Sequence, residues 1–250
     1  TSTGSGVGWE DAAAGGATAL DGLSDAVSGI TNFTRSLILG HQTTGTLDGA
    51  NDNTAVGYAA MDAITSGTVN TAVGSTALSA NTTAASNTAI GYGALTTATT
   101  GGLNTAVGRS ALLDLTTGTP NVAVGAYAGQ SVTTGASNTF IGYQAGDATT
   151  TADGNTAVGR DSLVANTTGD QNTAVGAISL DANTTGRNIV AVGYNTLGAN
   201  TTGASNVAVG MNALDANTTA DNNTAVGTDA LTANTTGTAN VAVGFGAGEG

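Results

Sequence analysis

The sequence predicts an all-β fold, a parallel β-solenoid built from 17-residue coils. The phrase Asn-Thr-Ala-Val-Gly, or a close variant, begins at Asn53 and returns every 17 residues up to Asn240 without an insertion. Its fifth residue is always Gly and its fourth is always Val or Ile. Only 4% of the 250 residues are aromatic and 8% are charged. Such a composition cannot build the thick core of an ordinary globular domain.

Each coil is expected to hold a strand, a short second strand and a turn. We number the positions of a coil from the first residue of the phrase, so Asn53 and Asn70 both occupy position 1. Position 9 is Leu or Met in nine copies and Gly in three, and Asn-Thr-Thr-Gly closes most coils. Strands stack about 4.8 Å apart, so thirteen coils predict a rod about 60 Å long.

Stacking in register places each residue above its equivalent in the next coil. We therefore expect structural ladders of Asn at position 1, of Val or Ile at position 4 and of Gly at position 5. The ladder residues are Asn53, Asn70, Asn87, Asn104, Asn121, Asn138, Asn155, Asn172, Val56, Val73, Ile90, Val107, Gly57, Gly74, Gly91 and Gly108.

The N-terminal part departs from the repeat. Residues 36–52 are expected to form a degenerate capping coil, because Leu37-Ile38-Leu39-Gly40 keeps the apolar fourth position and the Gly. Residues 1–35 are expected to be a linker with either an irregular docking segment or a short helical neck. The neck is suggested by a heptad-like spacing of Leu20, Leu23, Val27, Ile30 and Leu37.

The twelve repeats of residues 53–250 form the rest of the chain, and the last repeat is incomplete. The chain begins without Met and ends without a capping coil, so we expect it to be a piece of a longer protein. Each repeat offers only two reliable large apolar positions, the fourth and the ninth. One chain alone would leave an apolar stripe in water along its length. Packing against copies of itself, in an intertwined or side-by-side homotrimer, would cover the stripe.

The rare residues exclude several function classes. There is no Lys, there are only four Arg, and the net charge is −13, so binding to nucleic acid is not expected. The absence of Cys removes disulfides and thiol chemistry. The apolar runs are too short to insert into a membrane. The only histidine, His41, is interpreted as a loop residue rather than as part of a Ser36-His41-Asp48 catalytic set or a metal site. We expect no enzyme activity, cofactor or metal.

Three other groups of residues have a simple structural interpretation. Asp62, Asp147, Asp181 and Asp215 share position 10 and are interpreted as solvating charge rather than Ca²⁺ ligands. Asn-Thr-Thr fits a glycosylation signal but also a turn, which we favour. Thr-Thr at positions 13 and 14 in ten coils raises the alternative of an ice-binding face, although adjacent Thr residues on a strand point in opposite directions.

Position 6 is the most variable position of the coil. Exposed Tyr and Arg are common at recognition surfaces, so contact with a receptor or glycan is one interpretation. Their irregular order indicates no continuous platform, and packing between protomers is favoured. The larger side chains at this position are Tyr58, Tyr92, Arg109, Tyr143, Arg160, Tyr194, Met211 and Phe245.

Residues 36–250 carry a resemblance to known fibre proteins. The phrase Asn-Thr-Ala-Val-Gly-x-x-Ala-Leu resembles the head repeats of trimeric autotransporter adhesins, and more closely the repeats of bacteriophage tail-fibre and related virion-fibre proteins. The resemblance implies a left-handed β-roll in a homotrimer, located in an extracellular virion fibre.

The function implied by this resemblance is that of a rigid shaft in a tail or head fibre that supports attachment to a host cell. Its implied partners are other virion fibre or baseplate proteins, and a host receptor or glycan. The alternative is a bacterial surface adhesin that binds matrix or glycans. An ice-binding solenoid ranks lower.

Overall fold

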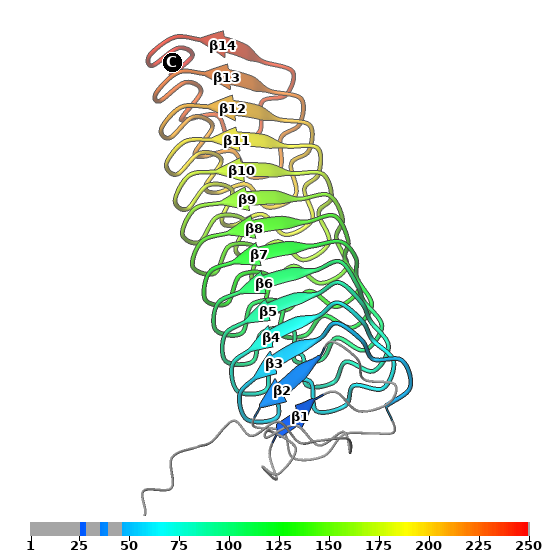
Figure 1. Cartoon of the computed structure of the whole chain (residues 1–250). Coiled ribbons are helices and arrows are strands. Elements are labelled where there is room, and N and C mark those ends of the chain that lie inside the picture. Colours follow the sequence, from blue (N-terminus) through cyan, green and yellow to red (C-terminus); the bar gives the residue numbers. More distant parts are fainter. Residues whose placement is uncertain (1–25, 29–35, 40–46, 250) are drawn as a thin grey trace, which may run out of the picture.

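Fourteen short strands form one continuous sheet in the computed structural model, which describes residues 26–28, 36–39 and 47–249 (Figure 1). Each strand has three residues and pairs with its neighbours in sequence order. The strands are β1 (Ala26–Ser28), β2 (Leu37–Leu39), β3 (Thr54–Val56), β4 (Thr71–Val73), β5 (Thr88–Ile90), β6 (Thr105–Val107), β7 (Val122–Val124), β8 (Thr139–Ile141), β9 (Thr156–Val158), β10 (Thr173–Val175), β11 (Val190–Val192), β12 (Val207–Val209), β13 (Thr224–Val226) and β14 (Val241–Val243).

The thirteen strands β2 to β14 run parallel, and each pairs in register with the residues 17 positions further along the chain. For example, Thr54 lies opposite Thr71 and Ala55 lies opposite Ala72. The strands stack along one side of a rod, and the rest of each coil winds around the other sides (Figure 1). The predicted β-solenoid of 17-residue coils is therefore confirmed.

The predicted second strand of each coil is wrong. After the strand, each described coil turns twice through residues with positive φ, at positions 7 and 9; Thr76 has φ 57° and Leu78 has φ 54°. L-residues rarely adopt this left-handed conformation, which interrupts a strand. Backbone hydrogen bonds between coils nevertheless continue here, from Thr76 N to Tyr58 O (2.8 Å) and from Leu78 N to Ala94 O (2.9 Å).

The core of the rod combines small residues with one or two larger ones in most coils. Position 3, the middle of each strand, is Ala in most coils, and Ala55 and Ala72 are fully buried. Position 8 is also small, and the Leu or Met of position 9, such as Leu78, fills the remaining space. A single chain thus closes a core of its own, because Ala lets the walls of a narrow coil approach closely.

One coil breaks this pattern with an aromatic residue. Phe140 stands at position 3 of β8, where the other repeats have Ala, and it is fully buried. Position 9 is Gly129 in the coil before and Gly146 in the same coil, instead of Leu. A Cβ at Gly129 would lie 2.7 Å from the Phe140 ring, and one at Gly146 would lie closer still. The ring therefore occupies the volume that two Leu side chains fill elsewhere.

The Asn side chains of position 1 lie inside the rod and join successive coils. Asn53 Oδ1 accepts a hydrogen bond from the backbone N–H of Asn70 (2.9 Å), and Asn53 Nδ2 donates to Gly67 O (2.8 Å). The same pair of bonds recurs up the stack, so most of these Asn residues satisfy two backbone groups that would otherwise be buried without a partner, whereas Asn155 Nδ2 has no hydrogen-bond partner. At the base, Ser36 Oγ takes the place of the Asn oxygen and accepts from Asn53 N (2.8 Å).

The position 1 ladder has one interruption in the described coils. Ile189 replaces Asn there and is fully buried. Its N–H still donates to Asn172 Oδ1 (3.1 Å), but Ile189 offers no oxygen to the N–H of Asn206 in the next coil. The sequence-based ladder of Asn is therefore continuous from Asn53 to Asn172 and resumes at Asn206.

The C-terminal half of the rod has a second Asn ladder at position 12. Asn183 Nδ2 donates to Asn166 Oδ1 (2.9 Å) and to Gly186 O (3.0 Å). In the N-terminal half, position 12 is mostly apolar, as in Ile64 and Leu115. The Asn-Thr-Thr segments are bends, and their Asn side chains at Asn81, Asn166, Asn183, Asn200 and Asn217 are buried in the rod.

The N-terminal strand β1 is antiparallel to β2, with Val27 opposite Ile38. A helical neck through Val27 is therefore wrong, because residues 26–28 are extended. Of the other residues with the heptad-like spacing, Leu20, Leu23 and Ile30 lie outside the described residues, and so does His41.

Candidate interaction surface

The outward side of the parallel strands forms an elongated apolar surface, which we call the strand face. It consists of the side chains at positions 2 and 4 of β2 to β14. Position 2 is Thr or Val in the twelve repeats and position 4 is Val or Ile. The Val56 and Ile90 side chains are both 40% exposed, whereas Ala55 and Ala89 between positions 2 and 4 are fully buried. The Val/Ile ladder is thus an exterior ladder.

The predicted apolar stripe of a single chain is confirmed by this arrangement. Position 4 points outward because side chains alternate along the strand and the Ala of position 3 points inward, whereas the Leu or Met of position 9, outside the strand, lies in the core. The Val and Ile residues therefore form a column that one protomer does not cover. This column makes the strand face a candidate interaction surface.

The Gly ladder at position 5 separates the strand face from the next residues of the coil. Gly57, Gly74, Gly91 and Gly108 have φ between 135° and 139°, a conformation open only to Gly. A Cβ at Gly57 would lie 2.6 Å from Gly74 O in the next coil. These glycines allow close stacking where the chain leaves the strand.

Beside the strand face lies a row of three tyrosines and one arginine, which we call the Tyr–Arg row. Arg109 Cζ lies 5.8 Å from the centre of the Tyr92 ring and 5.5 Å from that of Tyr127. The Tyr127 and Tyr143 rings meet edge to face, with centroids 5.9 Å apart and planes at 88°. Tyr92, Arg109, Tyr127 and Tyr143 come from four successive coils.

The expectation of no continuous platform holds for position 6 itself, but one part of the rod has a continuous row that position 6 alone does not predict. Position 6 is interrupted by Ala126, but Tyr127 at position 7 has φ 61° and its ring fills the gap. The sequence alone did not place Tyr127 in the row, because Tyr127 is at position 7 and the other three residues are at position 6. The signal was present in the sequence as a Tyr directly after the small residue.

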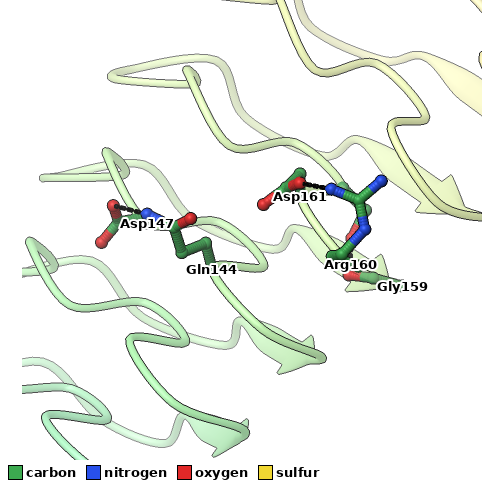
Figure 2. Close-up of polar contacts among 6 residues, drawn as sticks. Gln144, Asp147, Gly159, Arg160 and Asp161 are labelled. Atoms are coloured by element: carbon green, nitrogen blue, oxygen red, sulfur yellow. Dashed lines mark hydrogen bonds and ion pairs between the residues drawn. The ribbon is translucent and has the colours of Figure 1, made fainter.

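A second Arg at position 6 has a different environment. Arg160 forms an ion pair with the neighbouring carboxylate of Asp161 (Figure 2). One coil earlier, Gln144 Nε2 lies 3.5 Å from Asp147 Oδ2 (Figure 2). Arg109 has no such acidic partner among the described residues.

Three of the position 10 carboxylates are partly buried, and their pKa values are raised from the ordinary value of 3.8. Burial is the main cause for Asp147, Asp181 and Asp215. The hydrogen bond from Gln144 opposes the rise in the pKa of Asp147, and the bond from Asn195 Nδ2 to Asp215 Oδ1 (2.9 Å) opposes that of Asp215. The negative charges of Asp215 and Asp161 add to the rise in the pKa of Asp181.

We expect Asp181→Asn to raise the thermal midpoint by about 1 °C at pH 7, because it removes a charge that is less favourable in the folded state. The pKa of Asp181 is higher in the folded protein than its ordinary 3.8. Its destabilising effect is therefore full above the folded pKa and disappears as the pH falls toward 4. The gain should vanish below pH 4.

The matched control is Asp114→Asn, which changes the net charge equally at an exposed site. Thermal unfolding followed by circular dichroism between pH 3.5 and 8 checks the prediction. An equal gain in both variants at pH 7 would show that overall charge, rather than burial of Asp181, is responsible.

The described residues contain no group of three or more His, Cys, Asp or Glu that could hold a metal ion. Over the same residues, no helix is long and apolar enough to cross a membrane.

The Thr hydroxyls of position 13 form hydrogen bonds within the rod; Thr167 Oγ1, for example, donates to Thr184 O (3.0 Å). Thr168 at position 14 is exposed.

Comparison with known proteins gives no relative from which a function could be transferred. Neither a family model, nor a curated protein, nor a solved structure matches this chain significantly.

Proposed function

We propose that this chain is a structural segment of a fibre shaft and acts as a rigid spacer rather than as an enzyme. The observation that carries the proposal is the uninterrupted stack of thirteen parallel strands in one register. Each coil is tied to the next by backbone hydrogen bonds and, in most coils, by a buried Asn. Bending such a stack would break several of these bonds at once, so the rod resists bending and proteolysis.

The finer form of the proposal is a homotrimer of left-handed coils. The exposed column of Val and Ile along the strand face supports association. A second copy of the chain repeats its side chains with the same spacing of about 4.8 Å, so the apolar rows of two copies can interlock over their whole length. A cyclic trimer covers the strand face of every protomer and stays closed.

Native mass spectrometry of the whole chain tests this assembly. The expected mass is about 71 kDa, three times the 23.7 kDa of one chain. The triple substitution Val73→Glu, Val107→Glu and Ile141→Glu adds charge to alternate rungs of the strand face. It should convert the trimer to a folded monomer, because three carboxylates would have to be desolvated in the interface.

The control is Thr83→Glu, Thr117→Glu and Thr151→Glu, which adds the same charge at exposed position 14 outside the strand face. This variant should stay trimeric. A monomeric parent chain, or a trimer unaffected by the first triple substitution, would overturn association through the strand face.

We place the spacer in a virion fibre, next to other fibre or baseplate proteins, where it supports attachment to a host cell. The similarity of the repeat phrase to those of virion fibres supports this location. A bacterial surface adhesin is the second candidate, favoured by the exposed Tyr–Arg row. Loss of cell or matrix binding on replacing the row would favour the adhesin; unchanged binding would favour the spacer.

A further inference from the structure

Arg109 is a cation without an anionic partner among the residues that the structure describes. In the described part of the chain its guanidinium makes no ion pair and no hydrogen bond, and its neighbours are the rings of Tyr92 and Tyr127. The whole chain carries a net charge of −13 and only four Arg. Arg160, three coils further on, is instead paired with Asp161 (Figure 2).

The two rings hold the guanidinium in place without using its N–H donors. A guanidinium presents a planar fork that matches both oxygens of a carboxylate. Positioning by aromatic rings lowers the entropy cost of forming that pair. Arg109 is exposed, so a ligand can reach it from solvent.

The neighbouring tyrosines define the shape of the ligand. Tyr92 is 61% exposed and Tyr143 is 49% exposed, and the row crosses four coils, about 14 Å. Exposed rings with a polar hydroxyl suit a flat ligand that has both C–H faces and hydroxyl groups, which is the chemistry of a sugar. The strands beneath the row, β5 to β8, are paired on both sides, so a peptide cannot add to them as a further strand.

The negative net charge of the chain disfavours a ligand that carries many negative charges. A polyanion would meet one free cation at the row and a strongly negative molecule around it. A glycan with one carboxylate among neutral sugars would pair with Arg109 without that repulsion.

We propose that the Tyr–Arg row is a binding site for a glycan that carries an isolated acidic sugar. The carboxylate pairs with Arg109, and the adjoining neutral sugars pack on Tyr143 and Tyr92. The proposal rests on the second candidate function, the adhesin, and specifies its ligand. The site does not need the trimer, because all four residues come from one chain.

Calorimetric titration of the whole chain tests the site with two matched probes. One is a trisaccharide with a central glucuronic acid between two neutral hexoses, and the other is the same trisaccharide with glucose at the centre. The acidic probe should bind at least about tenfold more tightly than the neutral one, since a hydrogen-bonded charge pair is lost in the latter. Polygalacturonate should bind more weakly than the acidic trisaccharide.

Substitutions then locate the site. Arg109→Gln should weaken binding of the acidic probe at least about tenfold, and Arg109→Lys should also weaken it because the planar fork is lost. Tyr143→Ala should weaken both probes. Two controls should bind like the parent chain: Arg187→Gln, an exposed Arg outside the row, and Tyr194→Ala, an exposed position 6 Tyr flanked by Ala177 and Met211 in the adjacent coils.

Several results would overturn the site. These are equal binding of the two probes, binding of neither, unchanged binding in Arg109→Gln, or equal loss in the two controls. Equal binding of a short peptide with a free C-terminal carboxylate would also reject the preference for a sugar. A changed native mass of Arg109→Gln would show that the row belongs to a protomer interface instead.

Discussion

Replacing Phe140 with Ala is expected to lower the free energy of unfolding by about 3–5 kcal/mol. In every other repeat an Ala at position 3 lies beside Leu or Met at position 9 or next to the open end of the rod. At Phe140 both adjacent position 9 residues are Gly, so truncation leaves a cavity that no nearby side chain can fill. Chemical denaturation followed by circular dichroism measures the loss.

The same reasoning predicts a rescue. The triple variant Phe140→Ala, Gly129→Leu and Gly146→Leu converts this region to the regular pattern of the other coils, and it should recover most of the lost stability. Gly129→Leu with Gly146→Leu in the presence of Phe140 should be strongly destabilising, because the added side chains overlap the ring. A triple variant no more stable than Phe140→Ala would contradict the proposed exchange of volume.

Gly91→Ala is expected to destabilise the rod by about 3 kcal/mol or more. Gly91 has φ 139°, which an L-residue does not adopt without strain, and an added Cβ would overlap the carbonyl oxygen of Gly108 in the next coil. The Cβ would push the two coils apart where Gly108 N donates to Ile90 O (2.7 Å). Denaturant unfolding of this variant measures the effect.

Gly93→Ala, two residues further along the same coil, is the matched control. Gly93 has φ 66°, which is the conformation of the non-Gly residues at position 7, including Ala59 with φ 53°. Its nearest neighbour to an added Cβ is the Leu113 side chain at 3.4 Å, an ordinary contact. We expect a change within about 1 kcal/mol, and equal losses at Gly91 and Gly93 would refute the role of close coil stacking.

The period of the sequence was enough to predict the strands and their register. A repeat of constant length without insertions can stack only with each residue above its equivalent, so the pairing of Thr54 with Thr71 follows from spacing alone. The Asn ladder follows in the same way, because an Asn repeated at one position stacks on itself, but the spacing does not show that its side chains point into the rod.

The direction of the side chains could not be predicted from hydrophobicity. In the triplet Thr-Ala-Val either the Ala or the Val can face inward, and Val is the more apolar. The narrow coil admits the small Ala55, while Val56 stays outside. The positive φ of Leu78 was equally hidden, because Leu rarely adopts it and only the turn of the coil requires it.

Three of the four residues of the Tyr–Arg row could be found from the sequence. Tyr92, Arg109 and Tyr143 share position 6, but Tyr127 joins them only because the backbone at position 7 turns its ring into the gap beside Ala126. The compensation around Phe140 was visible as two Gly residues at position 9, yet its meaning depends on knowing that positions 3 and 9 meet in the core.

The length of the rod tests the central claim most directly. Small-angle X-ray scattering of the whole chain should be compared with that of a variant lacking residues 155–205, three complete coils that exclude the Phe140 region. If each coil adds one strand spacing to a rigid spacer, the variant should remain folded, keep the same cross-section and be shorter by about 14 Å. A variant that unfolds, or one whose length does not fall in proportion to the coils removed, would contradict the account.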